Sequence, residues 1–163
     1  MAQEARILVV DDEPKICQFL EVLLRREGYA VASVTDAHEA LRRIEKEPFD
    51  LVITDLKMPG MDGFELVRCI KAVRDDLPVV MITGYATVET AVQALRHGVD
   101  DYVTKPFNID ELRKVLARAL QSARAERENR ELQRRCVEVL QDLARALEAK
   151  DRYIHGHSQR VGE

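Results

Sequence analysis

The sequence contains no tryptophan, and aromatic residues make up only 5% of its 163 residues. Surfaces that bind nucleic acid usually combine aromatic side chains, on which bases stack, with an excess of positive charge. Here the formal net charge is −4 at pH 7. The composition gives no electrostatic footprint for DNA or RNA, and we expect no direct nucleic-acid partner.

Long apolar runs are also missing. Uninterrupted apolar stretches such as ILVV and VVMI are as short as strands, whereas a helix that spans a bilayer needs about 20 apolar residues. Met1 is followed by AQEAR, which does not resemble a signal sequence. We therefore expect no membrane partner and a cytoplasmic location.

Cysteine is scarce, with Cys17, Cys69 and Cys136 odd in number and far apart. This spacing favours neither a disulfide framework nor a zinc site. We interpret all three as small buried hydrophobic residues.

A repeated pattern occupies residues 5 to about 106, in which a short β-branched run is followed by an amphipathic helical stretch. The runs are ARILVV, YAVASV, DLVITD, LPVVMIT and DYVTK. Helix ends are marked by Pro14, Gly28 and Gly98, and by Asn108 with Glu111 as a capping-box-like start. The pattern predicts an α/β fold in which five parallel strands alternate with five helices, joined by right-handed crossovers.

Proline is absent after Pro106, and the next glycine is Gly156, so the last helix can run from about residue 110 to about residue 150. At 1.5 Å per residue this helix would be roughly 60 Å long. Beyond its first turns, apolar residues recur at alternating spacings of four and three: Leu132, Cys136, Val139, Leu143 and Ala146. This spacing predicts a parallel coiled coil or a small bundle, and hence a homodimer through the C-terminal helix. A solvated helix that crosses between domains is the alternative.

Polar residues stand at the carboxyl ends of four predicted strands: Asp11 and Asp12, then Asp55, Thr83 and Lys105. These ends meet at one edge of a parallel sheet, where ligands bind in such folds. Three crowded carboxylates repel one another unless a cation neutralises them. Magnesium suits this edge because it takes few carboxylates, keeps water ligands and accepts phosphate oxygens. The residues therefore predict a Mg²⁺ site that includes Asp11 and Asp12.

Asp55 is the candidate nucleophile of this edge. A carboxylate can attack phosphorus to form an aspartyl phosphate when the charge on the phosphoryl oxygens is stabilised. Lys105 would supply a positive charge and Thr83 a hydroxyl for those oxygens. Taken singly, a strand-end Asp is usually a cap or turn residue and a Lys-Pro pair a turn, so the functional interpretation depends on their combination.

Four motifs then occur together and in order: DD at 11–12, TDLKMPGMDGFE around Asp55, TGYA from Thr83, and DYVTKPF around Lys105. Over residues 5 to about 122 the chain resembles the receiver domains of two-component response regulators. The resemblance implies a flavodoxin-like (βα)5 fold, a doubly wound parallel sheet of strand order 2-1-3-4-5 with a long C-terminal helix extension.

The same resemblance implies roles for individual residues. Asp55 would be the phosphoacceptor of a cognate histidine kinase, with Lys105 and Thr83 as its catalytic partners. Mg²⁺ would be bound by Asp12, Asp55 and the backbone carbonyl of Lys57, while Asp11 acts mostly through water. Thr83 and Tyr102 would form a switch pair, and the Lys105–Pro106 peptide bond would be cis.

The C-terminal stretch ALEAKDRYIHGHSQRV resembles the opening helix of HD-GYP domains, metal-dependent phosphodiesterases of bacterial second messengers. By that resemblance His157 would be an early histidine of an output site, but the later motifs of the HD-GYP pattern are absent from this chain. It lacks a complete hydrolase site, so whether it belongs to an enzyme stays open. A polar end without function is the alternative.

The predicted organisation is a receiver domain at 1–122, a coiled-coil linker at 123–150 and the start of a truncated output domain at 151–163. We expect phosphorylation of Asp55 to signal through the long helix to a cyclic di-GMP phosphodiesterase. One alternative is a histidine-kinase dimerisation helix, although His157 precedes Ser-Gln-Arg-Val and not the Arg-Thr-Pro run of such helices. Another is a dimerisation scaffold that is never phosphorylated, which the complete set of site residues disfavours.

Overall fold

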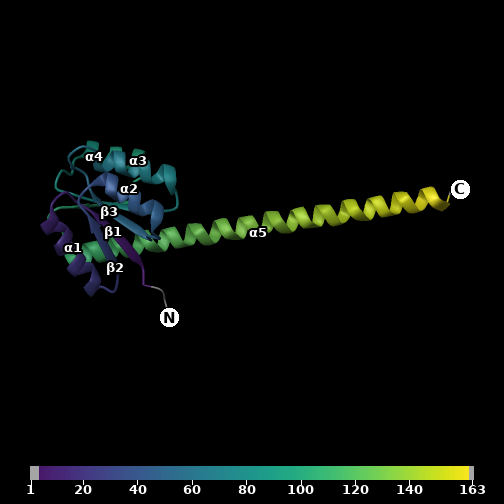
Figure 1. Cartoon of the computed structure of the whole chain (residues 1–163), viewed down its shortest axis with the longest axis horizontal. Helices are drawn as coiled ribbons and strands as arrows, with labels where there is room; N and C mark the ends of the chain where they lie inside the picture. Colours follow the sequence, from purple (N-terminus) through teal and green to yellow (C-terminus); the bar gives the residue numbers. More distant parts are fainter. Residues whose placement is uncertain (1–3, 162–163) are drawn as a thin grey trace. The chain divides into compact units, whose positions relative to one another are not determined.

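A computed structural model describes the backbone of residues 4–161 and the side chains of residues 4–158 (Figure 1). Five parallel strands form one sheet in the order β2-β1-β3-β4-β5, which confirms the predicted class and strand order. The strands are β1 (Arg6–Val10), β2 (Ala30–Val34), β3 (Leu51–Asp55), β4 (Val79–Thr83) and β5 (Asp101–Thr104). The helices are α1 (Pro14–Arg26), α2 (Ala37–Lys46), α3 (Gly63–Val73), α4 (Val88–His97) and α5 (Ile109–Val161).

Helices cover both faces of the sheet, so the central strands are nearly continuous aliphatic runs instead of alternating ones. Alternate residues of β1 enter different cores. Leu8 packs in the core that includes residues of α2 and α3, whereas Ile7 and Val9 pack in the core that includes residues of α1 and the first turns of α5. Burial on both faces fixes the register of these strands, because a shift by one residue would exchange the two faces.

Helix ends follow the expected signals. Asn108 accepts a 2.7 Å hydrogen bond from the Glu111 N–H at the start of α5. Gly98 ends α4 in the left-handed conformation, with φ of 86°. There a side chain would be strained, so glycine suits this C-terminal cap.

The chain divides into two units, residues 1–124 and 125–163, and α5 contributes to both. In the first unit α5 buries Leu112, Leu116 and Ala119 against the sheet. In the second unit its apolar side chains are exposed, with Leu132 at 60% and Val139 at 57%. The helix also ends later than expected, at Val161 and not near residue 150, because Gly156 lies within the helix without ending it.

The three cysteines differ in their exposure to solvent. Cys17 is buried, but Cys69 is half-buried and Cys136 exposed, so the expectation of three buried thiols is wrong. Cys136 is exposed because the α5 surface around it is itself uncovered in the single chain. Within residues 4–161, no helix combines the length and the apolarity needed to cross a bilayer.

Candidate functional site

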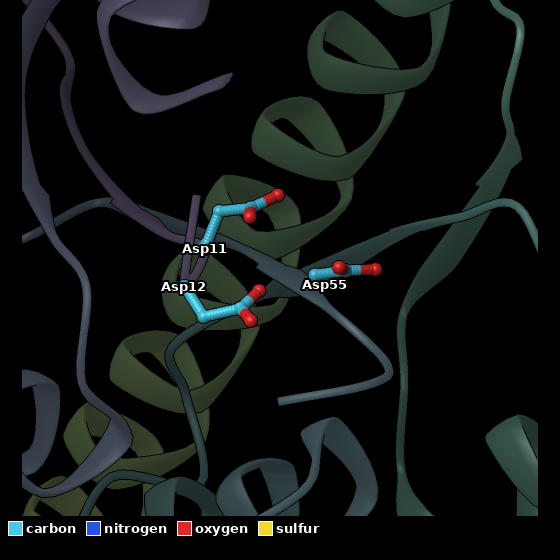
Figure 2. Close-up of side chains that lie close together, drawn as sticks. All are labelled: Asp11, Asp12 and Asp55. Atoms are coloured by element: carbon cyan, nitrogen blue, oxygen red, sulfur yellow. The ribbon is translucent and has the colours of Figure 1, made fainter. Parts of the chain in front are cut away.

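Three carboxylates converge at the carboxyl edge of the sheet (Figure 2). Asp55 ends β3, while Asp11 and Asp12 directly follow β1, its neighbour in the sheet. The parallel register pairs Val10 with Thr54, so the residues that follow them lie side by side. One oxygen from each carboxylate can be chosen so that all three lie within 4.8 Å of one another. The structure thus brings together the three predicted acidic ligands.

Lys105 extends from the end of β5 to this cluster. Its Nζ lies 3.6 Å from Asp11 Oδ2 and 3.7 Å from Asp55 Oδ2. These distances are too long for hydrogen bonds but short enough for ion pairs, so the ammonium is shared between two carboxylates. The Lys105–Pro106 peptide bond is cis, as predicted.

The cluster has an excess of negative charge, and burial disfavours the ionised form of its carboxyl groups. Desolvation is the largest influence on Asp55 and raises the pKa of its carboxyl group, against the lowering effects of Lys105 and of the Leu56 N–H. Desolvation likewise raises the pKa of Asp11, although the Glu13 N–H and Lys105 oppose it. Three carboxylates and one ammonium sum to −3 + 1 = −2 when all are ionised, so added positive charge would stabilise the ionised cluster.

This donor set fits a hard divalent cation. Carboxylate oxygens are the ligands that Mg²⁺ prefers over sulfur or imidazole. Asp11 is buried, and Asp12 and Asp55 are half-buried. The cluster is therefore a candidate Mg²⁺ site on its own chemistry.

The predicted switch residues lie on neighbouring strands and are linked through the loop between β4 and α4. Thr83 is fully buried, and its Oγ1 accepts a 3.0 Å hydrogen bond from the Tyr85 N–H. Tyr102, on β5, is half-buried, with its hydroxyl 3.3 Å from Thr90 Oγ1. The Thr90 hydroxyl in turn donates to the Tyr85 carbonyl at 3.1 Å. Thr83 and Tyr102 are thus connected through two residues that sequence reasoning did not single out.

Lys57 was predicted to act through its backbone carbonyl, but its side chain has a contact of its own. The ammonium lies 3.5 Å from the centroid of the Tyr85 ring, which is a cation–π geometry. Lys57 stands two residues after Asp55, and Tyr85 two residues after Thr83. β3 and β4 are adjacent, but Asp55 pairs with Ile82 and not with Thr83, so the strand register alone does not predict this contact.

The first turn of α3 packs directly on the end of β3. The Gly63 N–H donates a 2.7 Å hydrogen bond to the Leu56 carbonyl. A Cβ at position 63 would overlap the backbone oxygen of Asp55 and lie 2.9 Å from the Leu56 Cα. Only glycine permits this approach, so Gly63 helps to position the Asp55 backbone.

His157 lies apart from this chemistry, in the second unit. Its ring is exposed and stacks on that of Tyr153, with 6.2 Å between centroids. Within the described part of the chain, the acidic residue group that could hold a metal consists of the three aspartates and does not include His157. The structure therefore neither tests nor supports an output site at this histidine.

A parallel sheet of order 2-1-3-4-5, with an acidic cluster and a lysine at its carboxyl edge, defines the receiver class of flavodoxin-like folds. Residues 7–117 match the family model described as "Response regulator receiver domain", and the chain belongs to this family.

Comparison with individual proteins agrees with this assignment. The transcriptional regulatory protein ZraR of Salmonella typhimurium is 42% identical over 118 residues, which are 72% of this chain and 27% of ZraR. A CheY-like receiver domain from Methanospirillum hungatei has a TM-score of 0.72 at 36% identity, covering 76% of this chain and 99% of that one. The receiver domain of an HD domain-containing protein from Pseudomonas fluorescens has a TM-score of 0.71 at 29% identity, with 76% and 99% coverage. The chain spans less than half of the length of these curated relatives, for example 27% of ZraR and 42% of TcrA of Mycobacterium tuberculosis.

Proposed function

We propose that Asp55 of this response-regulator receiver accepts a phosphoryl group from a cognate histidine kinase. The observation that carries the proposal is the position of the Asp55 carboxylate, 3.7 Å from Lys105 Nζ and beside Asp11 and Asp12. A nucleophilic carboxylate flanked by a fixed cation and a candidate metal site has what phosphoryl transfer needs, namely position and charge stabilisation.

In the proposed reaction an Asp55 carboxylate oxygen attacks the phosphorus of a phosphohistidine. The new O–P bond forms as the N–P bond breaks, and the leaving imidazole nitrogen keeps the electron pair and takes up a proton. Lys105 lies close enough to pair with a phosphoryl oxygen that replaces the Asp55 charge. Thr83 has one hydroxyl proton to donate to a second oxygen. Both groups stabilise charge that develops during transfer.

Asp11, Asp12 and Asp55, with the backbone carbonyl of Lys57, would hold Mg²⁺ at this edge. When bound, the ion supplies positive charge that offsets the carboxylates and the phosphoryl oxygens. The carboxylates contribute the hard oxygen donors, and their burial increases the benefit of neutralisation.

A small phosphodonor tests the proposal. Acetyl phosphate with Mg²⁺ should attach one phosphoryl group to the intact chain, and peptide mapping by mass spectrometry should place it on Asp55. Asp55→Asn should abolish labelling, as should a chelator. Asp62→Asn is the matched control, because Asp62 is a half-buried carboxylate that caps α3 seven residues away along the chain. Labelling that persists in Asp55→Asn would overturn the assignment.

For the output, we propose an HD-GYP-type cyclic di-GMP phosphodiesterase that follows α5. The support is the resemblance of ALEAKDRYIHGHSQRV to the opening helix of such domains, together with the receiver of an HD domain-containing protein among the structural relatives. A transcriptional regulator is the second candidate, since ZraR is named as one. The expected lack of a nucleic-acid partner thus stays a prediction, as does the cytoplasmic location.

The gene sequence distinguishes these outputs. Codons after residue 163 that encode a paired His-Asp and a Gly-Tyr-Pro segment would support the phosphodiesterase. A DNA-binding module there would support the second candidate, and a histidine followed by a kinase ATP-binding domain would favour a histidine-kinase dimerisation helix.

We also propose that a second copy of the chain covers the exposed stripe of α5. Leu132, Val139 and Leu143 are each more than half exposed, at 60%, 57% and 55%. Burying each side chain is worth about 1.5 to 3 kcal/mol. Asn129 belongs to the same series, three residues before Leu132, and a single Asn at such a position favours a parallel, in-register pair.

A further inference from the structure

We propose that Thr90 is a positioning residue that holds the Tyr102 hydroxyl and the loop after Thr83 in the unphosphorylated arrangement. Release of the Tyr102 hydroxyl from Thr90 would let phosphorylation of Asp55 change the conformation of Tyr102. The signalling role of Thr90 rests on the proposed phosphorylation of Asp55. The hydrogen bonds of Thr90 themselves are present in the unphosphorylated protein.

Thr90 is half-buried in the first turn of α4, and several polar groups lie within hydrogen-bonding distance of its hydroxyl. The Thr87 N–H lies 2.9 Å from Thr90 Oγ1 and forms half of a capping box. Two hydroxyl groups lie 3.3 Å away, that of Tyr102 on β5 and that of Thr87. Two backbone carbonyl oxygens, of Tyr85 and Thr87, lie at 3.1 and 3.0 Å.

A threonine hydroxyl has one proton and two lone pairs, so it can form at most three of these hydrogen bonds at once, one as donor and two as acceptor. The Thr87 N–H can only donate and therefore uses one lone pair. The two carbonyls can only accept, so they compete for the single proton. Of the two neighbouring hydroxyl groups, that of Tyr102 can donate to the remaining lone pair, and that of Thr87 then directs its proton elsewhere. In this assignment Thr90 uses its full capacity, and Tyr102 is held by a group that also binds the loop.

The loop residue Tyr85 connects this arrangement to the phosphoacceptor edge. Its N–H donates to Thr83 Oγ1, and its carbonyl accepts from Thr90. A phosphoryl oxygen on Asp55 would attract the Thr83 hydroxyl. Movement of Thr83 toward that oxygen weakens the bond from the Tyr85 N–H. The Tyr85 carbonyl then shifts relative to Thr90, and the Tyr102 hydroxyl loses its fixed partner.

An ordinary capping role must be separated from this positioning role. Three variants of the full chain do so. Thr90→Val keeps the shape and removes the hydroxyl, Thr90→Ser keeps the hydroxyl, and Thr87→Ala removes the other side chain of the capping box while leaving Thr90 in place. If Thr90 only caps α4, then Thr87→Ala and Thr90→Val should behave alike.

The readout is the ¹⁹F NMR signal of Tyr102 in protein made with 3-fluorotyrosine, assigned by its loss in Tyr102→Phe. Before any phosphodonor is added, we expect Thr90→Val to move the signal away from its wild-type position, and Thr90→Ser and Thr87→Ala to leave it there. Acetyl phosphate with Mg²⁺ should move the wild-type signal in the same direction as Thr90→Val does.

The inference is overturned if the unphosphorylated Thr90→Val signal coincides with the wild-type signal, or if Thr87→Ala moves it equally. A wild-type chain that takes no label would instead count against the proposed function, and the comparison of unphosphorylated variants would still decide whether Thr90 holds Tyr102.

Discussion

The ammonium group of Lys57 lies 3.5 Å from the centroid of the Tyr85 ring and joins the loop after β3 to the loop after β4. The first of these loops follows Asp55 and the second follows Thr83. Tyr85 is 55% exposed, so the contact lies at the solvent side of the candidate site. It couples the two segments that would have to adjust together around a phosphoryl group.

A double-mutant cycle measures this coupling. Lys57→Met and Tyr85→Leu each remove one partner, and the interaction energy from urea denaturation should be about 0.5 to 1 kcal/mol, as for other exposed cation–π pairs. A cycle of Lys57→Met with Tyr29→Leu should give no coupling, because Tyr29 precedes β2 at the opposite edge of the sheet. Strict additivity of the first pair would show that the contact contributes nothing in solution.

The acidic cluster predicts an unusual pH dependence of stability in the absence of metal. Burial raises the pKa of Asp11 and of Asp55 above the value of an unfolded chain, which is about 3.9 for Asp. The folded state therefore favours the protonated carboxyls. Their favourable contribution to the free energy of unfolding is complete below the unfolded pKa and is lost as the pH rises through the folded pKa.

Asp55→Asn should consequently raise the free energy of unfolding at pH 7 in the presence of a chelator, and this gain should shrink toward pH 4. Urea denaturation at both pH values, with Asp62→Asn as a control outside the acidic cluster, provides the measurement. A stabilisation of equal size at both pH values would rule out the charge of Asp55 as its cause.

The proposed dimer has a native reporter in Cys136. In a parallel, in-register pair the two copies of this exposed thiol would face each other, because Cys136 lies in the same series as Leu132 and Val139. Mild oxidation should give a covalent dimer on non-reducing electrophoresis. Cys136→Ser should abolish the dimer band, and Cys69→Ser should retain it.

Disruption of the stripe provides the matched comparison. Val139→Glu should convert the dimer to a monomer in light scattering, whereas Gln141→Glu, which adds the same charge to the same turn outside the series, should not. A monomeric wild-type chain at high micromolar concentration would contradict the proposal.

The sheet edge could be predicted from sequence because local patterns determine it. Apolar runs that end in Asp11, Asp55 and Thr83 fix both the strand and its carboxyl end, and parallel pairing brings those ends together whatever the loops do. The end of α5 could not be predicted with equal accuracy, since glycine only weakens a helix and Gly156 did not end this one.

The contacts of Thr90 and of Lys57 escaped prediction for a different reason. Both depend on the path of the loop between β4 and α4, which brings Tyr85 against side chains from two other elements. No periodicity encodes that path. Cys136 was misjudged because an apolar neighbourhood in sequence predicts burial only where a partner surface exists, and the single chain provides none there.

Two glycines beside the site, Gly63 and Gly84, differ in how tightly their surroundings are packed. At Gly63 the backbone of α3 packs against the end of β3 so closely that no room is left even for a methyl group. At Gly84 the nearest atom to an added Cβ would be 4.0 Å away, on Lys105, which is an ordinary contact. The backbone beside the site is therefore packed more tightly at the start of α3 than at Gly84, so a larger residue should be tolerated at position 84 and not at position 63.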